Sequence, residues 1–334
     1  MDTETRQTRQ TKQAKKFPVW RFLIVTTLFW CAQYTYTAYF TPWLEELQIA
    51  SQLIGTITGA YGFSQFLIRI PLGAYADHNG KHRPVILAGL LILIIPGLLL
   101  RFTQLPALIL LARFLAGVAA STWVSFTVFY QNALRGETNR NMGTINAANS
   151  AGLLAGYLVS TLLINRIGMN GLFVLSSAFS LLGAILFITC PSLSAFDLGN
   201  KGANELPPFR ETFCQKELLG SAGLMPLLPF LVFATVQSFS ANVAVSTGIA
   251  HAYLGIFSAI FTAAGLLAQA YIAKRSEQGP SDRMLLILGF LLAGLPGQPR
   301  PAVAATPEML VAEAAEEALA ATLEAGSEIS VHFM

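Results

Sequence analysis

The chain has 334 residues, of which 54% are hydrophobic and only 12% are charged, and its formal net charge is +3. Soluble domains carry about 25% charged residues, so this chain has roughly half of the usual share. Most of its apolar runs also lack the polar faces at a 3.6-residue period that soluble helices show. The composition therefore excludes a soluble protein.

Long apolar runs follow one another along the chain, and each is close to the ~20 residues that cross a hydrocarbon core ~30 Å thick. We expect an all-α fold: a multi-spanning helical membrane protein with a six-helix N-terminal bundle and an incomplete second bundle. The eight predicted spans are residues 22–43, 52–75, 84–100, 105–130, 143–164, 171–190, 221–242 and 250–273.

Composition also predicts where the chain divides. The best boundary is a polar segment with a double proline after the sixth span. A ninth apolar run of about a dozen residues is too short to cross a bilayer, so we expect a truncated, frame-shifted or short form that is inactive as a monomer. The predicted parts are a basic cytoplasmic tail (1–19), the N-terminal bundle (20–190), a cytoplasmic linker (191–220), a partial C-terminal bundle (221–295) and an acidic tail that does not span (296–334).

Basic residues are distributed unevenly around the predicted spans. Sixteen lie before the first span, in the even-numbered connections or after the eighth span, whereas only Arg101 and Arg166 lie at the odd-numbered connections. The positive-inside rule then places the N-terminus in the cytoplasm, and we expect a multi-pass protein of the cell (inner or plasma) membrane. The basic tail lacks the interleaved aromatic residues of a nucleic-acid-binding arm. Three scattered cysteines indicate neither a disulfide framework nor a metal site.

The connection between the second and third spans holds a dense motif, GAYADHNGKHRP. Gly73 lacks a side chain where another helix can come close, and Asp77 is placed to accept at a helix terminus or to pair with an arginine. Gly80 permits the positive φ of a tight turn, while Lys81 and Arg83 hold the turn at the headgroup level. These residues form a candidate latch for conformational gating; the alternative is an ordinary basic turn.

These residues resemble the loop signature of the major facilitator superfamily, Gly-x-x-x-Asp-x-x-Gly followed by basic residues. The preceding RIPLG, from Arg69 to Gly73, is also similar to that family, and RFLAG, from Arg113 to Gly117, resembles its arginine motif in the fourth span. The resemblance covers about residues 20–295. It implies a transporter of two helical halves that works by alternating access.

The fifth predicted span resembles the antiporter motif of the same family in part. Gly143, Gly152 and Gly156 follow the spacing of that motif, but Tyr157 replaces its proline. Small residues also recur at every fourth position from Ala148 to Ser160, a stripe that favours close helix packing. We expect such packing at Gly117, Gly152 and Gly156.

Arginines are the charged residues that fall inside the predicted spans. Arg113 lies about eight residues into the fourth span, where a charge costs a few kcal/mol unless it faces a cavity or a partner. It either snorkels to the outer interface or serves as a substrate or proton-relay residue in a central cavity. For Arg69, snorkelling or pairing near Asp77 is favoured. None of the eighteen acidic residues falls in the middle of a span, so the sequence does not identify the coupling ion.

Polar and aromatic residues share one face of the first predicted span, where Trp30, Gln33 and Tyr34 follow helical spacing. In the seventh span, Gln237 belongs to a similar stripe. Such stripes suit a cavity for a mid-sized, largely uncharged organic solute, or alternatively hydrogen bonds between helices.

The sequence thus predicts a transporter without a cofactor, whose partners are a small-molecule solute, the lipid bilayer and, if transport is coupled, protons. Efflux of amphipathic compounds is favoured. Uptake of a small metabolite, and a non-transporting remnant or partner subunit, are the alternatives. An enzyme is not expected, because no span shows a Ser/His/Asp set, an HExxH or a CxxC.

Overall fold

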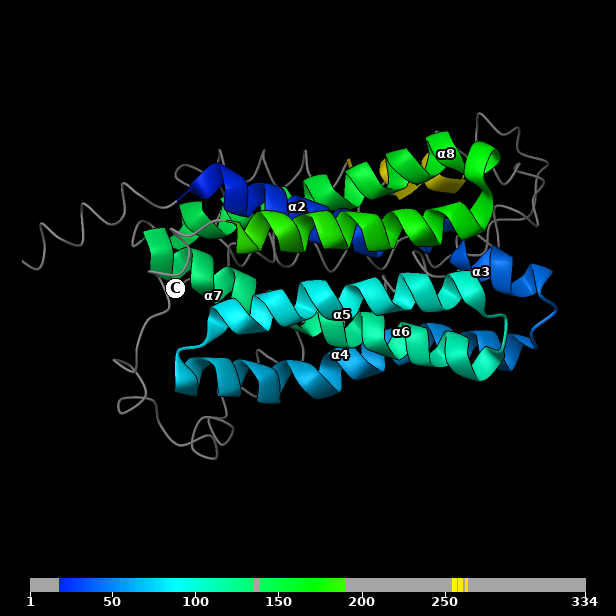
Figure 1. Cartoon of the computed structure of the whole chain (residues 1–334), viewed down its shortest axis with the longest axis horizontal. Helices are drawn as coiled ribbons and strands as arrows, with labels where there is room; N and C mark the ends of the chain where they lie inside the picture. Colours follow the sequence, from blue (N-terminus) through cyan, green and yellow to red (C-terminus); the bar gives the residue numbers. More distant parts are fainter. Residues whose placement is uncertain (1–17, 135–137, 190–253, 257, 261, 264–334) are drawn as a thin grey trace, which may run out of the picture. The chain divides into compact units, whose positions relative to one another are not determined.

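A computed structural model describes residues 18–134 and 138–189, and the short pieces 254–256, 258–260 and 262–263. By its contacts the chain divides into two compact units, residues 1–37 with 43–206, and residues 38–42 with 207–334. All regular secondary structure in the described residues is α-helical (Figure 1), which confirms the predicted all-α class. The predicted seventh span, with Gln237, lies outside the described residues.

Each of the six predicted spans of the first half is helical. The helices are α2 (Val19–Tyr34), α3 (Thr37–Glu46), α4 (Ser51–Asn79), α5 (His82–Phe102), α6 (Pro106–Ser121), α7 (Trp123–Leu134) and α8 (Thr138–Ile188). The backbone of α8 leaves the helical conformation at Gly168 (φ 64°, ψ −177°), so α8 consists of two limbs, residues 138–167 and 169–188. Within the described residues, three stretches are long and apolar enough to cross a membrane: His82–Phe102, Pro106–Leu134 and Asn141–Ile188.

Two of the predicted spans are each broken into two helices. The first breaks between α2 and α3, where Thr35 Oγ1 donates to the Cys31 carbonyl at 2.6 Å. The fourth breaks between α6 and α7, where Ser121 Oγ donates to the Val118 carbonyl at 2.6 Å and Thr122 Oγ1 to the Ala119 carbonyl at 2.7 Å. Hydroxyl groups that bond back to the preceding turn compete with the backbone ladder and bend helices, which accounts for both breaks.

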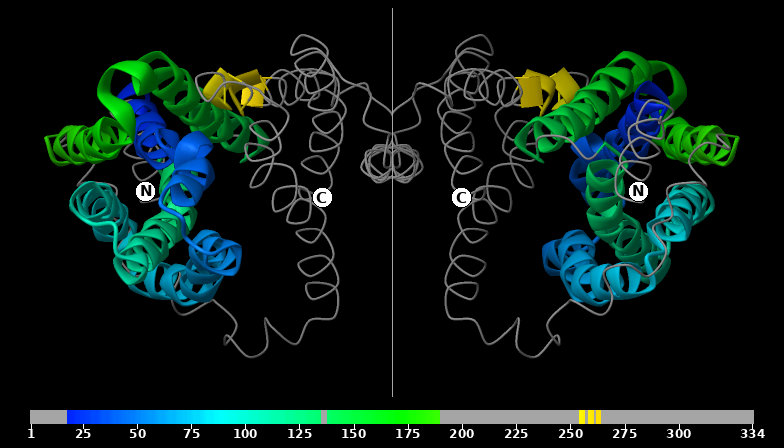
Figure 2. Two further views of the ribbon diagram at one scale, coloured as in Figure 1. Left: turned by 90° about the vertical axis from the view of Figure 1, so that its right-hand side faces the viewer. Right: turned by 90° about the vertical axis from the view of Figure 1, so that its left-hand side faces the viewer.

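Helix α2 packs between the two limbs of α8 (Figure 2). Thr27 Oγ1 donates to the Ala148 carbonyl of the first limb at 3.1 Å, and Ser176 Oγ of the second limb donates to the Ala32 carbonyl at 2.6 Å. Hydrogen bonds between helices contribute ~0.6 kcal/mol each in membrane proteins. Here they also fix the rotation of α2, and so decide which of its side chains face the interior.

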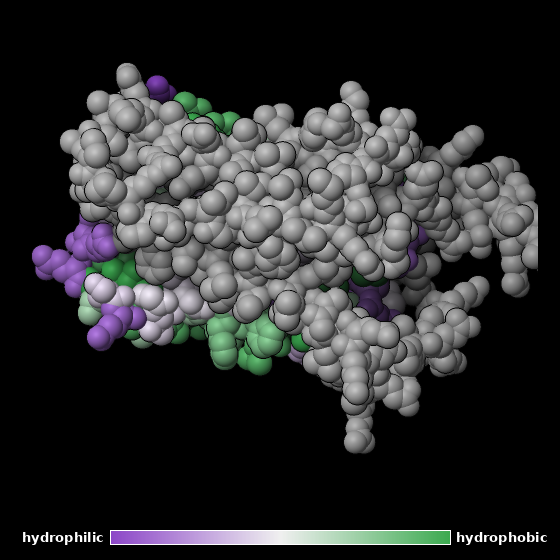
Figure 3. All heavy atoms as spheres, turned by 180° about the vertical axis from the view of Figure 1, so that it is seen from behind, coloured by the Kyte–Doolittle hydropathy of each residue, from purple (hydrophilic) through white to green (hydrophobic). Residues whose placement is uncertain are grey.

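The surface of the described helices changes character along their length. Large apolar side chains are exposed, among them Phe66 (73% exposed) and Leu162 (72%). Where the described surface is visible from behind, polar purple lies toward both the left-hand and the right-hand side, and apolar green lies between them (Figure 3). An apolar band of this kind is the surface that a bilayer covers.

Candidate functional site

The α4–α6 contact brings an arginine and a tyrosine together inside the bundle. A Cβ added at Gly117 of α6 would collide with Ser64 Oγ and with the Tyr61 carbonyl oxygen of α4, so only glycine lets these two backbones come so close. One turn before Gly117, the guanidinium carbon of Arg113 lies 4.9 Å from the centroid of the Tyr61 ring. Arg113 is 6% exposed, so this cation–π contact is formed away from water, where it is strongest.

Arg113 therefore does not snorkel outward; its side chain is buried against α4. The cost of burying a guanidinium is met in part by the ring of Tyr61. Of the two outcomes expected for Arg69, snorkelling or pairing near Asp77, the pairing is not formed among the described residues, because the Asp77 carboxylate lies beside His82.

Aromatic rings extend this cluster across three further helices. Trp30 of α2 meets Trp123 of α7 edge to face, with centroids 5.4 Å apart, and lies 6.1 Å from Tyr34. Tyr34 in turn meets Tyr157 of α8 edge to face at 5.5 Å. Each edge-to-face pair stabilises the packing by about 0.5–1.5 kcal/mol beyond the contribution of its buried area. These contacts therefore hold the rings in fixed positions relative to one another.

Buried polar atoms without a partner lie on the same helices. Gln33, 2% exposed, donates from Nε2 to the Ala116 carbonyl of α6 at 3.0 Å, but no described group bonds its buried Oε1. Trp30 Nε1 and Asn149 Oδ1 are likewise buried without a hydrogen bond from the described residues. An unsatisfied buried polar atom costs about 1–3 kcal/mol. Of these three atoms, Trp30 Nε1 is a donor, and Gln33 Oε1 and Asn149 Oδ1 are acceptors.

Two predicted packing glycines position this site. A Cβ at Gly152 would lie 2.6 Å from the Thr27 carbonyl oxygen and 2.7 Å from Trp30 Cβ, and one at Gly156 would lie 3.0 Å from the Cys31 carbonyl oxygen. These contacts press the first limb of α8 against α2. The third glycine of the partial antiporter motif, Gly143, has nothing described within 4 Å.

The predicted latch forms the turn between α4 and α5. Gly80 adopts φ 61° and ψ 21°, the left-handed conformation expected of it, and caps α4. Asp77 Oδ1 lies 3.5 Å from His82 Nε2, so its ion-pair partner among the described residues is a histidine and not an arginine. Arg83 stacks over the Phe187 ring of α8 at 6.0 Å, while Lys81 is exposed.

The neighbouring helix does not come close enough to Gly73 for a glycine to be required there. A Cβ there would meet Val124 Cγ1 at 3.6 Å, an ordinary contact. The structure therefore brings the candidate site residues together in two groups. The first group is the interior cluster, which joins Arg113, Trp30, Gln33 and Tyr34 to Tyr61, Trp123, Asn149 and Tyr157. The second group is the set of latch residues, which lie at the α4–α5 turn.

Sequence reasoning missed part of the interior cluster. Tyr61, Trp123 and Asn149 belong to no motif, and Tyr157 was noticed only as a departure from a glycine and proline pattern. The signal available was weak: polar or aromatic residues in otherwise aliphatic spans, at depths similar to that of Arg113. Their proximity follows from helix packing, which the sequence of a single chain does not display.

Together, the helices and their buried polar site define a multi-pass helical membrane protein. Comparison with known proteins gives its family: the profile of the Major Facilitator Superfamily matches residues 22–311, and the chain belongs to that family. The predicted resemblance is thereby confirmed.

Individual relatives agree with this assignment. A "Tetracycline resistance protein, class C" of Escherichia coli is 24% identical over 242 residues, 70% of this chain and 60% of that protein. An "Uncharacterized transporter" of Buchnera aphidicola subsp. Schizaphis graminum is 25% identical over 141 residues, 42% of this chain and 36% of that protein. The chain thus spans less than two thirds of the length of either relative.

A solved structure shows the same fold. The nucleoside transporter NupG superposes with a TM-score of 0.66 over 92% of this chain and 80% of its own, at 15% identity. At that identity the likeness concerns the fold alone.

Proposed function

We propose that the chain moves a small organic solute across the cell membrane by alternating access, and that the interior cluster supplies the first half's share of the solute site. The observation that carries the proposal is the set of buried, unsatisfied polar atoms of Trp30 and Gln33 beside the Arg113–Tyr61 pair. A rigid aromatic wall with a few convergent polar groups is the usual construction of a small-molecule site.

The charges of the spans narrow the class of solute. Arg69 and Arg113 lie within α4 and α6, and the sequence has no acidic residue between Asp77 and Glu137 or between Glu137 and Asp197. An excess of positive charge in a low-dielectric interior repels cations. We therefore expect aromatic or amphipathic solutes that are neutral, zwitterionic or anionic, and not organic cations.

Export is the favoured direction, supported by the relation to a tetracycline resistance protein. The carboxylates of the described helices, Glu45, Glu46 and Asp77, lie at helix ends and not in mid-span, so proton coupling is tested by measurement. Everted membrane vesicles test direction directly: an exporter accumulates solute in them, whereas an importer accumulates it in right-side-out vesicles. Collapse of a proton gradient abolishes accumulation only if protons drive it.

Binding is tested by tryptophan fluorescence of the purified chain in nanodiscs, because Trp30 and Trp123 lie in the cluster. We expect tetracycline or a similar amphipathic aromatic probe to change the emission in a saturable way. Trp30→Phe should weaken binding by about tenfold, the loss of one hydrogen bond to a buried donor. The matched control is Trp20→Phe, because Trp20 is 62% exposed. Equal affinities of the two variants would refute the site.

We also propose that the N-terminus and the α4–α5 turn face the cytoplasm, and that the Gly168 bend faces outside, from the uneven distribution of basic residues. In a chain without its native cysteines, Asn170→Cys should react with an impermeant thiol reagent in intact cells. Asn79→Cys should react only after permeabilisation. The opposite pattern would reverse the orientation.

A further inference from the structure

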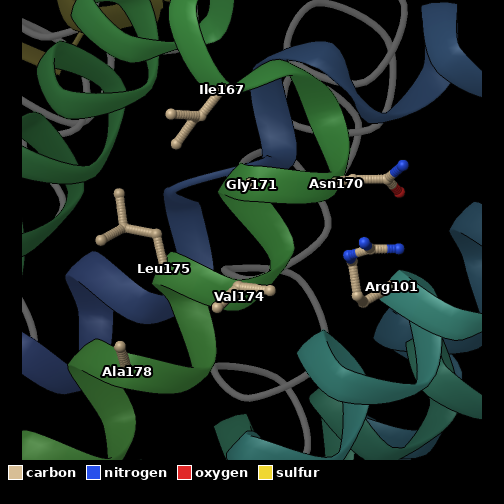
Figure 4. Close-up of a pocket in the computed structure, with 7 residues that line it drawn as sticks. All are labelled: Arg101, Ile167, Asn170, Gly171, Val174, Leu175 and Ala178. Carbon is tan, nitrogen blue, oxygen red and sulfur yellow. The ribbon is translucent and has the colours of Figure 1, made fainter.

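A cleft lies between α5 and the second limb of α8, away from the interior cluster. Its cavity volume is about 440 Å³ (Figure 4). It is lined by Arg101 from the last turn of α5, and by Ile167, Asn170, Gly171, Val174, Leu175 and Ala178 of α8.

On one side of the cleft, α5 and α8 are held together by hydrogen bonds and by a close glycine contact. Ser180 Oγ donates to the Leu90 carbonyl at 2.6 Å, and Ser177 Oγ donates to the Ile94 carbonyl at 2.9 Å. One turn further along, a Cβ at Gly97 would lie 2.5 Å from the Phe173 carbonyl oxygen. On the other side of the cleft, α8 bends at Gly168, and Arg101 lines the cleft from the last turn of α5.

The two ends of the cleft differ in chemistry. Arg101 and Asn170 lie on the same side in the close-up, where α5 ends and α8 bends (Figure 4). Val174 and Ala178 continue one face of α8 toward the middle of the span, and Val174 is 44% exposed. A cationic and amide-bearing end at the membrane interface, followed by an open apolar channel, matches a lipid headgroup followed by an acyl chain.

The distribution of basic residues supplies an independent argument. Arg101 and Arg166 are the two basic residues at odd-numbered connections, so the positive-inside rule does not account for them. Both belong to this region, because Arg166 precedes the lining residue Ile167. The guanidinium carbon of Arg101 lies 5.5 Å from the centroid of the neighbouring Phe102 ring, and no acidic residue lies in α5 or α8.

We propose that this cleft binds a phospholipid with an anionic headgroup, with the lipid phosphate at Arg101 and Asn170 and one acyl chain along Val174 and Ala178. The inference is independent of transport, because none of its residues belongs to the interior cluster. Lipid is favoured over a soluble ligand because the apolar part of the cleft opens onto the face that a bilayer covers.

The test uses the purified full chain in phosphatidylcholine nanodiscs that contain a trace of phosphatidylglycerol with a photoreactive group in its acyl chain. After illumination and digestion, we expect cross-links concentrated on residues 171–178. Unlabelled phosphatidylglycerol should compete, whereas phosphatidylcholine and inorganic phosphate should not. Uniform labelling of all helices, or equal competition by phosphatidylcholine, would overturn the proposal.

Two variants test the contact with the lipid headgroup and the contact with the acyl chain separately. Arg101→Gln should lower labelling of residues 171–178 about fivefold, as expected for one basic residue at a lipid surface. Ala178→Trp should abolish it by filling the channel. The matched control is Arg21→Gln, since Arg21 is also an exposed arginine over an aromatic ring, that of Trp20 at 5.1 Å. Arg101 is exposed, so its loss leaves the fold intact, and unchanged labelling of Arg101→Gln would refute the headgroup contact.

Discussion

Glycines of α8 and glycines of α4 look alike in the sequence and differ completely in the structure. Gly152 and Gly156 of α8 press against α2, where an added Cβ would meet backbone atoms at 2.6 Å and 3.0 Å. Around Gly55 and Gly59 of α4, nothing described lies within 4 Å. A four-residue glycine spacing thus marks a contact in one helix and, within the described residues, an open face in the other. Gly152→Leu and Gly59→Leu test this difference directly, and substitutions at the α4–α6 contact and at the α4–α5 turn are expected to have effects between these two.

The largest effect should come from Gly152→Leu. Four side-chain carbons placed against the Thr27 carbonyl and Trp30 would force α2 and α8 apart, and overpacking costs about 1–3 kcal/mol or more. We expect Tm in detergent to fall by about 5–10 °C, with loss of the monodisperse peak in size exclusion. A variant as stable as the parent would show that the α2–α8 contact tolerates separation.

Gly117→Val should come next, because it separates α4 from α6 at the Tyr61 carbonyl. We expect a loss of about 2 kcal/mol in stability, together with loss of solute binding as Arg113 leaves the Tyr61 ring. Arg113→Gln provides the comparison. The Arg113→Gln variant should lose solute binding without a similar fall in Tm. Normal binding by the Gly117→Val variant would contradict the view that Gly117 is needed to place Arg113 against the Tyr61 ring.

A smaller effect is expected at the α4–α5 turn, where the Asp77 carboxylate is 42% exposed. Exposed ion pairs contribute up to ~1 kcal/mol, so Asp77→Asn should slow transport by about fivefold or less without affecting membrane insertion. The imidazole of His82 is charged only when protonated, so the pair is present at low pH and is lost as pH rises.

His82→Gln should therefore reduce the difference in transport between pH 5.5 and pH 8. The matched control is His78→Gln, one position from Asp77 but exposed. If Asp77→Asn transports at the parental rate, the turn serves orientation and not gating.

The smallest effect should be that of Gly59→Leu. With no described atom within 4 Å of its Cβ, we expect the stability of the first bundle to change by less than ~0.5 kcal/mol. Thermal unfolding beside Gly152→Leu measures the contrast directly. A comparable loss in both variants would mean that the α4 face is as tightly covered as the α8 face.

Much of the fold follows from the sequence, because hydrophobic length alone locates a membrane helix. The structure is helical in each of the six predicted segments of the first half, and most of the helices extend beyond the predicted bounds; α4, for example, continues to Asn79. The breaks at Thr35 and Thr122 could not be predicted in the same way. The apolar runs continue through both, and only the side-chain bonds of the hydroxyl residues reveal them.

The site was predictable only in part. Arg113 stands out because a charge in a span needs an explanation, and the stripe of Trp30, Gln33 and Tyr34 follows from helical spacing. The sequence left two alternatives open for Gln33, a hydrogen bond between helices or a place in a solute cavity, and its amide is compatible with both. Its Nε2 donates from α2 to α6, while its Oε1 has no described partner. Tyr61 could not be found in advance, because its role depends on the short α4–α6 distance that Gly117 permits.

The two helix breaks have a mechanical consequence. Each of these spans consists of two short rods joined at hydroxyl residues, and Tyr34 and Trp123 are the residues that directly adjoin the joints. The backbone torsions that set the angle between the two rods of each span therefore lie next to an aromatic ring of the interior cluster, so a change of that angle in either span would shift the ring beside its joint.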